Sequence, residues 1–366
     1  MLTLEIPYYV RFFQEKLFPF LEERIGKLTE KHKELLSILE LIKVETYISV
    51  KYRQVGNQEY DRAAMARFFI AKKMYNFSIT KDFIEIVRND RQLRTICGFS
   101  EGVLPSESTF SRAFKEFSKI GLPEKLQEMV VKRTLNTKLI GHISRDSTAI
   151  QVDEKSKRKK KEDIEIKVKK KRGRLKKGEI KTPKDPTRLE RQGKMTLEEM
   201  IAELPKECDF GTKKNSKGKV EHWKGGKLHI DWADGEIPIS CVYTSASVHD
   251  SQAAIPLSLI TASRVTSLYD LMDAAYDSEE IRKQSKALGH IPIIDSNKRK
   301  GKVKEISPAE KIRYNERTTA ERGNSLLKER FGIRKILVKG CKKVFAELMF
   351  AILALTAKRV LNLASI

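Results

Sequence analysis

The sequence has few cysteines, tryptophans and prolines, and it has no long apolar run. The four cysteines are Cys97, Cys208, Cys241 and Cys341. They form no C-x-x-C pair and no zinc-ligand spacing, so we expect buried thiols in a reducing compartment. The longest uncharged run near the C-terminus, Leu348 to Ala357, is too short to cross a bilayer. The first residues lack the charged and apolar segments of a secretory signal. These absences favour a cytoplasmic protein without a membrane partner.

Positive charge is what the chain has in excess. Among 366 residues, 73 Lys and Arg stand against 49 Asp and Glu, a formal net charge of +24. This excess indicates a polyanionic partner. The run from Lys155 to Lys177 holds fourteen Lys or Arg and three acidic residues. We expect this run, and the wider insertion at about 153–224, to form a flexible arm that can lie along a DNA backbone.

One segment near the C-terminus, 313–330, has the pattern of a two-faced helix. Its functional face carries a phenol, a guanidinium, a carboxylate and an ammonium group at offsets 0, 3, 7 and 14: Tyr314, Arg317, Glu321 and Lys328. At 3.6 residues per turn, these four side chains share one stripe. The opposite side carries Ala320, Gly323 and Leu327, which suit packing on a core. A lone carboxylate among cations suits a metal held beside a phosphodiester. The alternative is an amphipathic helix with solvated charges.

Two further carboxylates are predicted to lie on strands. The segment 143–150 is rich in β-branched residues and contains Asp146, in a strand interior where aspartate is disfavoured. The segment 267–273 is predicted to be a strand that ends at Asp273, before a helix over 279–288. Asp270 and Asp277 are the competing carboxylates in this region. We expect Asp277 or Ser278 to cap the helix, which leaves Asp273 as the candidate ligand.

The block between these two acidic segments is predicted to be a β-hairpin. Leu228, Ile230 and Trp232 alternate with more polar residues at a period of two. Asp234-Gly235 is a strong hairpin turn signal, and a second strand follows from Ile237. The dipeptide His249-Asp250 then opens a predicted helix over 251–259. A hairpin of this kind is common and by itself indicates no function.

Taken in order, these segments resemble the insertion-sequence DDE transposases. The pattern Y-x2-R-x3-E-x6-K resembles the signature of that group, and Asp273 with the following x-x-Tyr-Asp-Ser resembles its second acidic motif. The hairpin block is similar to the family's "K-L-H … D-G-x-P … H-D-S" region. The resemblance implies an α/β, ribonuclease H-like catalytic domain over 136–366, with a mixed sheet, flanking helices and a central first strand. It also implies cleavage at transposon ends and strand transfer into target DNA.

The resemblance assigns a role to each residue of the predicted site. Asp146, Asp273 and Glu321 would be the catalytic carboxylates and would hold two Mg²⁺ or Mn²⁺ ions. Tyr314, Arg317 and Lys328 would bind phosphates of the transposon end. The partners it implies are double-stranded DNA, as terminal inverted repeats and target, and a second copy of the chain in a synaptic complex. The resemblance also implies that the protein acts in the cytoplasm of a prokaryote.

The N-terminal third, 1–135, is predicted to be a helical, DNA-binding domain. We expect one helix over 82–97, a turn region over 98–105, and a second helix from Ser106 to about 118. The second helix has an apolar stripe of Phe110, Ala113, Phe114 and Phe117, and its remaining face includes the candidate DNA contacts Arg112 and Lys115. The turn is longer than in the usual helix-turn-helix motif, so a plain helical bundle remains an alternative.

A second set of candidate DNA contacts lies in the basic arm. Lys171, Arg172 and Arg174 lie in a stretch that resembles the arginine-glycine-arginine core of an AT-hook, with Leu175 in place of the usual proline.

Two other functions share many of these features. A nuclease of the same fold would cut DNA without joining it, and only a strand-transfer assay separates the two. A transposase-derived DNA-binding protein without catalysis is the other alternative, and the complete set of Asp146, Asp273 and Glu321 argues against it.

Overall fold

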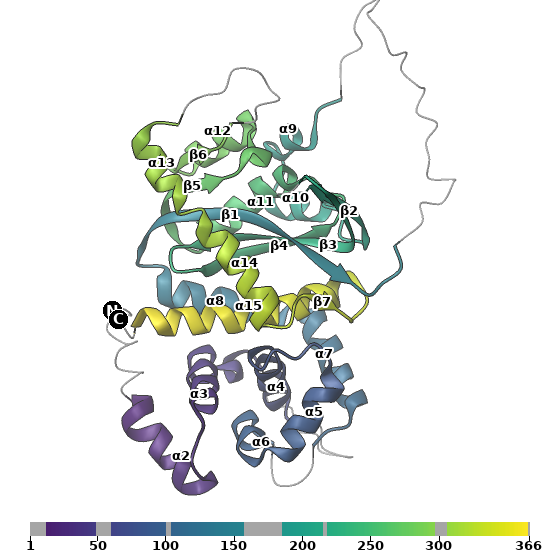
Figure 1. The fold of residues 1–366 in the computed structure, drawn as a ribbon, viewed down its shortest axis with the longest axis vertical. Coiled ribbons are helices and arrows are strands. Elements are labelled where there is room, and N and C mark those ends of the chain that lie inside the picture. The colour runs from purple at the N-terminus through teal and green to yellow at the C-terminus, as the bar shows by residue number, and fades with distance from the viewer. Residues whose placement is uncertain are drawn as a thin grey trace, which may run out of the picture.

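The structure is a computed structural model that describes residues 12–48, 60–99, 104–156, 185–214, 218–296 and 306–364 (Figure 1). Most of the basic run lies outside the described residues, and so do the predicted DNA contacts Lys171, Arg172 and Arg174.

A mixed seven-stranded sheet forms the upper half of the molecule in Figure 1. The strands are β1 (Leu139–Val152), β2 (Asp209–Lys214), β3 (Val220–Ala233), β4 (Ile237–Ser245), β5 (Thr266–Met272), β6 (Ile291–Ile294) and β7 (Lys335–Ile336). The main order is β2-β3-β1-β5-β6, with β4 paired to β3 and β7 paired to β1. Strand β1 runs antiparallel to β3 and parallel to β5. The predicted central position of the first strand is therefore confirmed.

The N-terminal helices form the lower half of the molecule (Figure 1). They are α2 (Phe18–Ile25), α3 (Glu30–Ile42), α4 (Arg62–Met74), α5 (Thr80–Asn89), α6 (Arg91–Cys97), α7 (Glu107–Ile120) and α8 (Leu122–Leu135), with short π- and 3₁₀-helical turns at Phe13–Leu17 and Val44–Tyr47. The prediction of one helix over 82–97 was wrong. The side chain of Asp90 accepts a hydrogen bond from the backbone of Leu93 at 2.8 Å, so it caps a new helix at that point.

Helix α7 follows its sequence pattern closely. It begins after Ser106, as predicted, and its four apolar residues are buried: Phe110, Ala113, Phe114 and Phe117. The rings of Phe110 and Phe114 pack near Phe68 and Phe69 of α4, with centroid distances of 4.1 Å for Phe68–Phe110 and 5.0 Å for Phe69–Phe114. Aromatic packing therefore ties α7 to α4.

Helix α15 (Cys341–Ala364) joins the helical half to the sheet. In Figure 1 it lies between the sheet and helices α3 and α4. Phe350 of α15 contacts Phe69 of α4 with a centroid distance of 5.6 Å, and Phe345 stacks on Tyr243 of β4 at 6.5 Å. One continuous apolar core therefore includes residues of both halves. The domain boundary near residue 135 stays a prediction, because the last helix packs on both sides of it.

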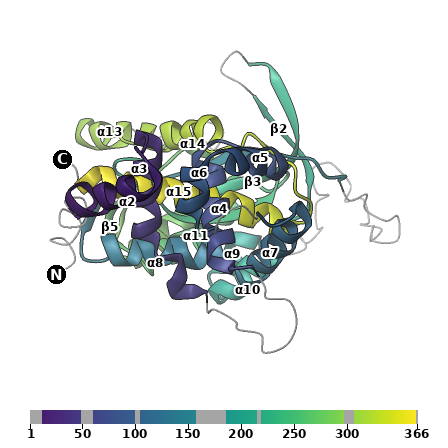
Figure 2. The same cartoon turned by 90° about the horizontal axis from the view of Figure 1, so that it is seen from below.

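The described part of the insertion at about 153–224 is folded, which corrects the expectation of a flexible arm for that part. Its described part contains α9 (Arg188–Gln192), α10 (Leu197–Glu203), β2 and the first residues of β3. Figure 2 shows β2 reaching away from the body of the molecule. The segment after Cys208 forms β2 because it pairs antiparallel with β3, with Asp209 opposite Gly225.

The remaining helices lie around the sheet: α11 (Ala254–Ala262), α12 (Glu279–Ala287), α13 (Pro308–Asn315) and α14 (Thr318–Arg330), with 3₁₀ turns at Asp250–Ala253 and Ala274–Tyr276. The prediction of one helix over 313–330 was wrong, since α13 and α14 are separate. At their junction the backbone makes tight bonds three residues apart, from Arg317 to Tyr314 at 3.0 Å and from Ala320 to Arg317 at 3.0 Å. Such bonds are those of a 3₁₀ turn, which interrupts the α-helical hydrogen bonding between the two helices.

The cysteines are only partly as predicted. All four are free thiols, and Cys97 and Cys208 are buried. Cys241 is half-buried and Cys341 is exposed, which corrects the expectation of four buried thiols. Cys341 is exposed because it begins α15, directly after a turn at Gly340. None of the helices in the described ranges combines the length and the apolar composition that a membrane crossing requires.

A buried ion-pair cluster connects the two halves and generates the first prediction. Glu347 of α15 contacts Lys72 at 2.8 Å and Lys73 at 2.6 Å, both from α4, and all three side chains are buried. Burial opposes ionisation of Glu347, but the two ammonium groups outweigh it and lower its pKa to about 2. Burial also lowers the pKa of Lys73 to about 8, although Glu347 opposes this.

Glu347→Gln should lower the free energy of unfolding by about 3–5 kcal/mol at pH 7, because it leaves two buried ammonium groups without a counterion. The control Glu30→Gln, which breaks an exposed pair with Lys33, should cost less than about 0.5 kcal/mol. Since the pKa of Glu347 is lower in the folded chain, its contribution should be complete above its ordinary value of 4.5 and shrink as the pH falls toward 2. Denaturant titration of the variants from pH 7 downward measures both effects. Equal stabilities at pH 7 would contradict a stabilising cluster.

Candidate functional site

The fold brings Asp146 and Asp273 together. In the parallel pairing of β1 with β5, Ser144 lies opposite Leu271. Two residues further along both strands, the same register places Asp146 beside Asp273, just past the end of β5. The Asp273 carboxylate accepts a hydrogen bond from the backbone N–H of Ala275 at 2.9 Å, which holds it at the carboxyl end of the strand. Two residues far apart in the sequence therefore lie side by side at the carboxyl end of β5.

Helix α14 packs on the face of the sheet to which Asp146 points. Gly323 lies against the ring of Trp232 in β3, where an added Cβ would approach a ring carbon to 2.5 Å. Ala320 and Leu327 are fully buried beside it, so the predicted apolar wall of this helix is confirmed. One residue after Gly323, the Asn324 amide donates a hydrogen bond from Nδ2 to Asp146 Oδ2 at 2.9 Å.

The third predicted carboxylate, Glu321, is turned toward an arginine. Arg317 Nη2 donates to Glu321 Oε1 at 2.8 Å, and Arg317 Nη1 lies 4.0 Å from Asp146 Oδ1. The Glu321 side chain is 60% exposed. In the part of the chain that the structure describes, no three His, Cys, Asp or Glu side chains are grouped closely enough to hold a metal ion. The structure thus brings the two aspartates together and places an arginine between Asp146 and Glu321.

The surroundings of the two aspartates disfavour their ionised forms and raise the pKa values of both. Burial raises the pKa of Asp146 to about 6, Arg317 opposes this rise, and repulsion from Asp273 and Asp250 adds to it. Burial is also the main reason that the pKa of Asp273 is raised. A divalent cation between the two carboxylates would relieve this repulsion, and hard oxygen donors are the ligands that Mg²⁺ and Mn²⁺ prefer. The aspartate pair therefore fits such an ion.

The other residues of the predicted signature gather around the same carboxylates. The Arg317 guanidinium lies 6.0 Å from the centroid of the Tyr314 ring, so the two remain neighbours despite the break between α13 and α14. Burial is the main cause that lowers the pKa of Lys328; the nearby charge of Lys213 lowers it further, and Asp146 opposes the change. Lys328 is therefore a half-buried cation within electrostatic reach of Asp146.

The two competing aspartates have structural partners. Asp270 is buried and lies 3.2 Å from His290 Nδ1. Asp277 accepts a hydrogen bond from Arg282 at 3.0 Å, and Ser278 is the residue that precedes α12. Neither aspartate is held beside Asp146 in the way that Asp273 is.

The candidate DNA contacts of the helical half lie on a solvent-facing surface. Arg112 and Lys115 are exposed on α7, opposite its buried phenylalanines. The Arg112 guanidinium donates to Thr109 of the same helix at 3.1 Å. Both side chains are accessible to a large partner.

Asn324 is the residue of the site that the sequence did not single out. It is 7% exposed, and its carbonyl oxygen Oδ1 has no hydrogen-bond partner among the described residues, although its amide nitrogen binds Asp146. The available signal was its spacing, because a residue three positions after Glu321 faces the same side of a helix. The unpaired oxygen adds one more hard donor beside the aspartates.

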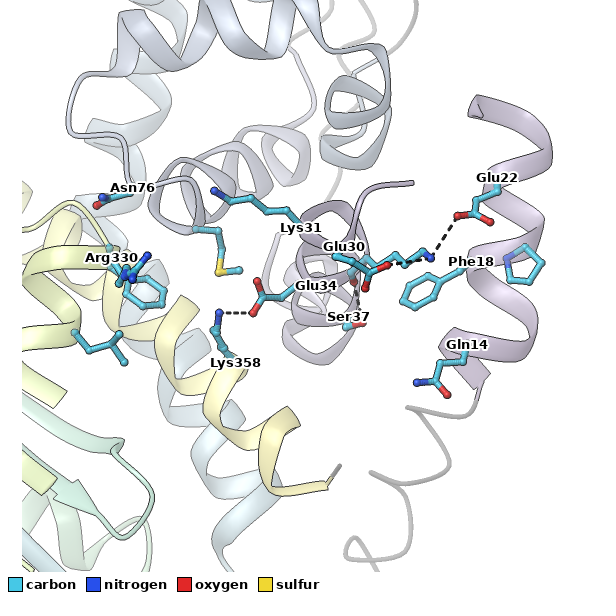
Figure 3. A pocket seen from close by; sticks show the side chains of 15 residues that line it. Gln14, Phe18, Glu22, Glu30, Lys31, Glu34, Ser37, Asn76, Arg330 and Lys358 are labelled. Carbon is cyan, nitrogen blue, oxygen red and sulfur yellow. Dashed lines mark hydrogen bonds and ion pairs between the residues drawn. The ribbon is translucent and has the colours of Figure 1, made fainter. Parts of the chain in front are cut away.

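A cavity among the described residues lies away from this site. It has a volume of about 1070 Å³ between the N-terminal helices and the rear of α14 and α15 (Figure 3). Several charges that line it are paired: Lys33 lies 3.6 Å from Glu22, and Lys358 lies 2.5 Å from Glu34. A polyanion would gain little from cations that are already neutralised.

Comparison with known families agrees with this geometry. Residues 137–357 match the family model described as "Transposase DDE domain", and residues 21–116 match "Transposase domain (DUF772)". No curated protein matched the chain. The first match covers more than half of the sequence and includes β1, β5 and α14. It implies that the mixed sheet with its flanking helices is a ribonuclease H-like fold. The chain therefore belongs to the DDE transposase family.

Proposed function

We propose that this transposase cleaves DNA at transposon ends and joins them to target DNA by a two-metal DDE mechanism, with Asp146, Asp273 and Glu321 as its catalytic carboxylates. The observation that carries the proposal is the pair of half-buried aspartates at the end of β5, beneath Arg317. Two like charges held together against repulsion are characteristic of sites that bind cations or reacting groups.

The chemistry needs few protein groups. Two Mg²⁺ or Mn²⁺ ions, when bound, would activate the attacking oxygen and stabilise the leaving 3′-oxygen. Asp146, Asp273 and Glu321 would together hold the two ions, Glu321 after turning toward the aspartates. Asn324 keeps the Asp146 carboxylate oriented through its amide hydrogen bond.

Arg317 would couple DNA binding to the assembly of the site. In the free chain, Arg317 contacts Glu321 and lies near Asp146. Its positive charge therefore occupies two of the three carboxylates that would bind a metal ion. A DNA phosphate is a competing, bidentate partner for the guanidinium. If Arg317 binds a phosphate in place of Glu321, the Glu321 side chain would be able to rotate toward the two aspartates. Tyr314 and Lys328 lie close enough to bind neighbouring phosphates.

Double-stranded DNA is the partner that the excess positive charge fits best. Arg112 and Lys115 on α7 would contact the terminal inverted repeats, and Lys171, Arg172 and Arg174 of the basic arm would contact DNA without strong sequence preference. A homodimer in a synaptic complex would hold two ends together. The same-fold nuclease would give cut ends and no joined product when end DNA is incubated with a target plasmid, so that assay separates the two functions.

The second prediction concerns the three carboxylates. Asp146→Asn, Asp273→Asn and Glu321→Gln should each lower Mg²⁺-dependent cleavage of end DNA by about a hundredfold or more, since each loses several kcal/mol of charge stabilisation in the transition state. DNA binding should remain within a few-fold of wild type. The control Glu329→Gln, an exposed residue of the same helix, should cleave normally. Any of the three variants that cleaves within tenfold of wild type is removed from the catalytic set.

The third prediction separates a phosphate clamp from a solvated helix surface. Arg317→Ala should fold normally and lose cleavage by at least about tenfold, because a charge-assisted contact contributes about 1.5–3 kcal/mol. Arg317→Lys should not rescue it, since an ammonium group lacks the planar fork. Lys328→Arg should retain part of the activity. Normal cleavage by the Tyr314, Arg317 and Lys328 alanine variants would contradict the clamp, and thermal unfolding of the same samples tests the fold.

A further inference from the structure

A second ion pair lies behind the two aspartates. Lys227 Nζ is 2.9 Å from Asp250 Oδ1 and donates to the backbone carbonyl of Val248, also at 2.9 Å. The two side chains are only 16% and 23% exposed. They come from opposite ends of the β3–β4 hairpin block, which the sequence singled out without a chemical role. The fold therefore joins the start and the end of that block through one charged contact.

The pair approaches the aspartates from the face opposite α14. Cross-strand pairing sets Lys227 beside Ala149 and His229 beside Ser147, so these residues share one face of the sheet. Asp146 points to the other face, toward α14. Ser147, the next residue after Asp146, hydrogen-bonds Asp250 through its side chain. Arg317 and Lys227 thus lie on opposite sides of the same acidic centre.

Asp250 acts on both candidate metal ligands as a fixed negative charge. Burial opposes its ionisation, but His229, Lys227 and the hydrogen bonds from Lys227 and Ser147 outweigh burial and lower its pKa. Burial lowers the pKa of His229 itself to about 4, so Lys227 is the cation beside Asp250 at pH 7. In turn, its charge raises the pKa of Asp146 and of Asp273, where burial is the larger cause. Three carboxylates therefore repel one another at this edge of the sheet.

A buried hydroxyl among these carboxylates provides an independent sign that something binds here. Tyr276 is 1% exposed, and its hydroxyl has no hydrogen-bond partner within the described ranges. Burial raises its pKa well above the ordinary value, and Asp250, Asp146 and Asp273 raise it further, in that order. A buried hydroxyl without a partner is unfavourable, so the arrangement suits a bound group that completes its hydrogen bonding.

We propose that Asp250 supplies a third negative charge that draws divalent cations to Asp146 and Asp273, and that Lys227 is its counterion in the metal-free protein. This inference rests on the proposed function. Asp250 would act on a bound cation through space, and the Tyr276 hydroxyl would hydrogen-bond the group bound there. Because Lys227 cancels part of the attraction, removal of the two partners of this ion pair has opposite effects on metal affinity. A purely structural ion pair would give effects of the same sign.

The test is binding of Mn²⁺ alone to the full chain without DNA, measured from the electron paramagnetic resonance signal of the free ion. Asp250→Asn should weaken binding by about tenfold, and Lys227→Gln should tighten it by about threefold or more, as expected for unit charges near a half-buried site. Tyr276→Phe should unfold at a temperature equal to or above that of wild type without metal, since it removes a buried hydroxyl that has no partner among the described residues, and it should bind Mn²⁺ more weakly. Lys227→Arg should bind as wild type does.

The matched control is Asp277→Asn, which removes another half-buried, ion-paired carboxylate of the same region and should leave Mn²⁺ affinity unchanged. Unchanged affinity in Asp250→Asn, or weaker binding in both Asp250→Asn and Lys227→Gln, would overturn the inference and leave the proposed function intact. If Lys227→Gln does not fold, Lys227→Met keeps the apolar stem and carries the same test. If Asp146→Asn binds Mn²⁺ as tightly as wild type, the proposed function fails together with this inference.

Discussion

The ion pair between Arg145 and Asp231 fixes how β1 pairs with β3 and, through β1, where Asp146 lies. Both residues are buried, and the guanidinium donates two hydrogen bonds to the carboxylate, each of 2.7 Å. Thr261 of α11 donates to the same carboxylate at 2.6 Å. A buried charge without a partner costs several kcal/mol, so β1 and β3 are held in the one register that joins these two residues. Arg145 also reaches the sulfur of Met272, the last residue of β5, at 3.5 Å.

Strand geometry turns this structural pair into a functional constraint. Because successive side chains point to opposite faces, a guanidinium fixed toward α11 directs the next residue, Asp146, toward α14. On that side, Gly323 permits the close approach of α14 to Trp232, and Asn324 reaches the carboxylate. One face of the sheet therefore carries the structural charges, and the other carries the candidate chemistry. The acidic centre lies at the carboxyl end of β5, where charged groups from both faces of the sheet can act on it.

Much of this arrangement could be predicted from the sequence, and the exceptions have physical causes. The strands that carry Asp146 and end at Asp273, and the hairpin between them, follow from alternation and turn signals, which are local. The two helix breaks, at Asp90 and at Arg317, were missed because a single cap or tight turn interrupts an otherwise helical pattern. The role of Asn324 was missed because periodicity shows which face a residue shares and not what lies opposite.

Contacts between side chains far apart in the sequence could not be predicted from the sequence. The contact of Glu321 with Arg317 follows their spacing of four residues, but the preference of Glu321 for this arginine over the aspartates depends on the approach of α14. The pairing of Lys227 with Asp250 depends on the fold of the whole hairpin block. The continuity of the core through α15 requires contacts between the first and last parts of the chain.

The central claim is that Asp146 and Asp273 bind a divalent cation and that Glu321 joins them when DNA displaces it from Arg317. Anomalous X-ray diffraction from crystals of the chain with Mn²⁺ and end DNA tests this most directly. The account predicts a manganese peak at about 2.0–2.2 Å from oxygens of both aspartates, with Arg317 on a phosphate and Glu321 turned to the metal. A cleavage-competent complex without metal between the aspartates, or with Glu321 still on Arg317, would contradict it.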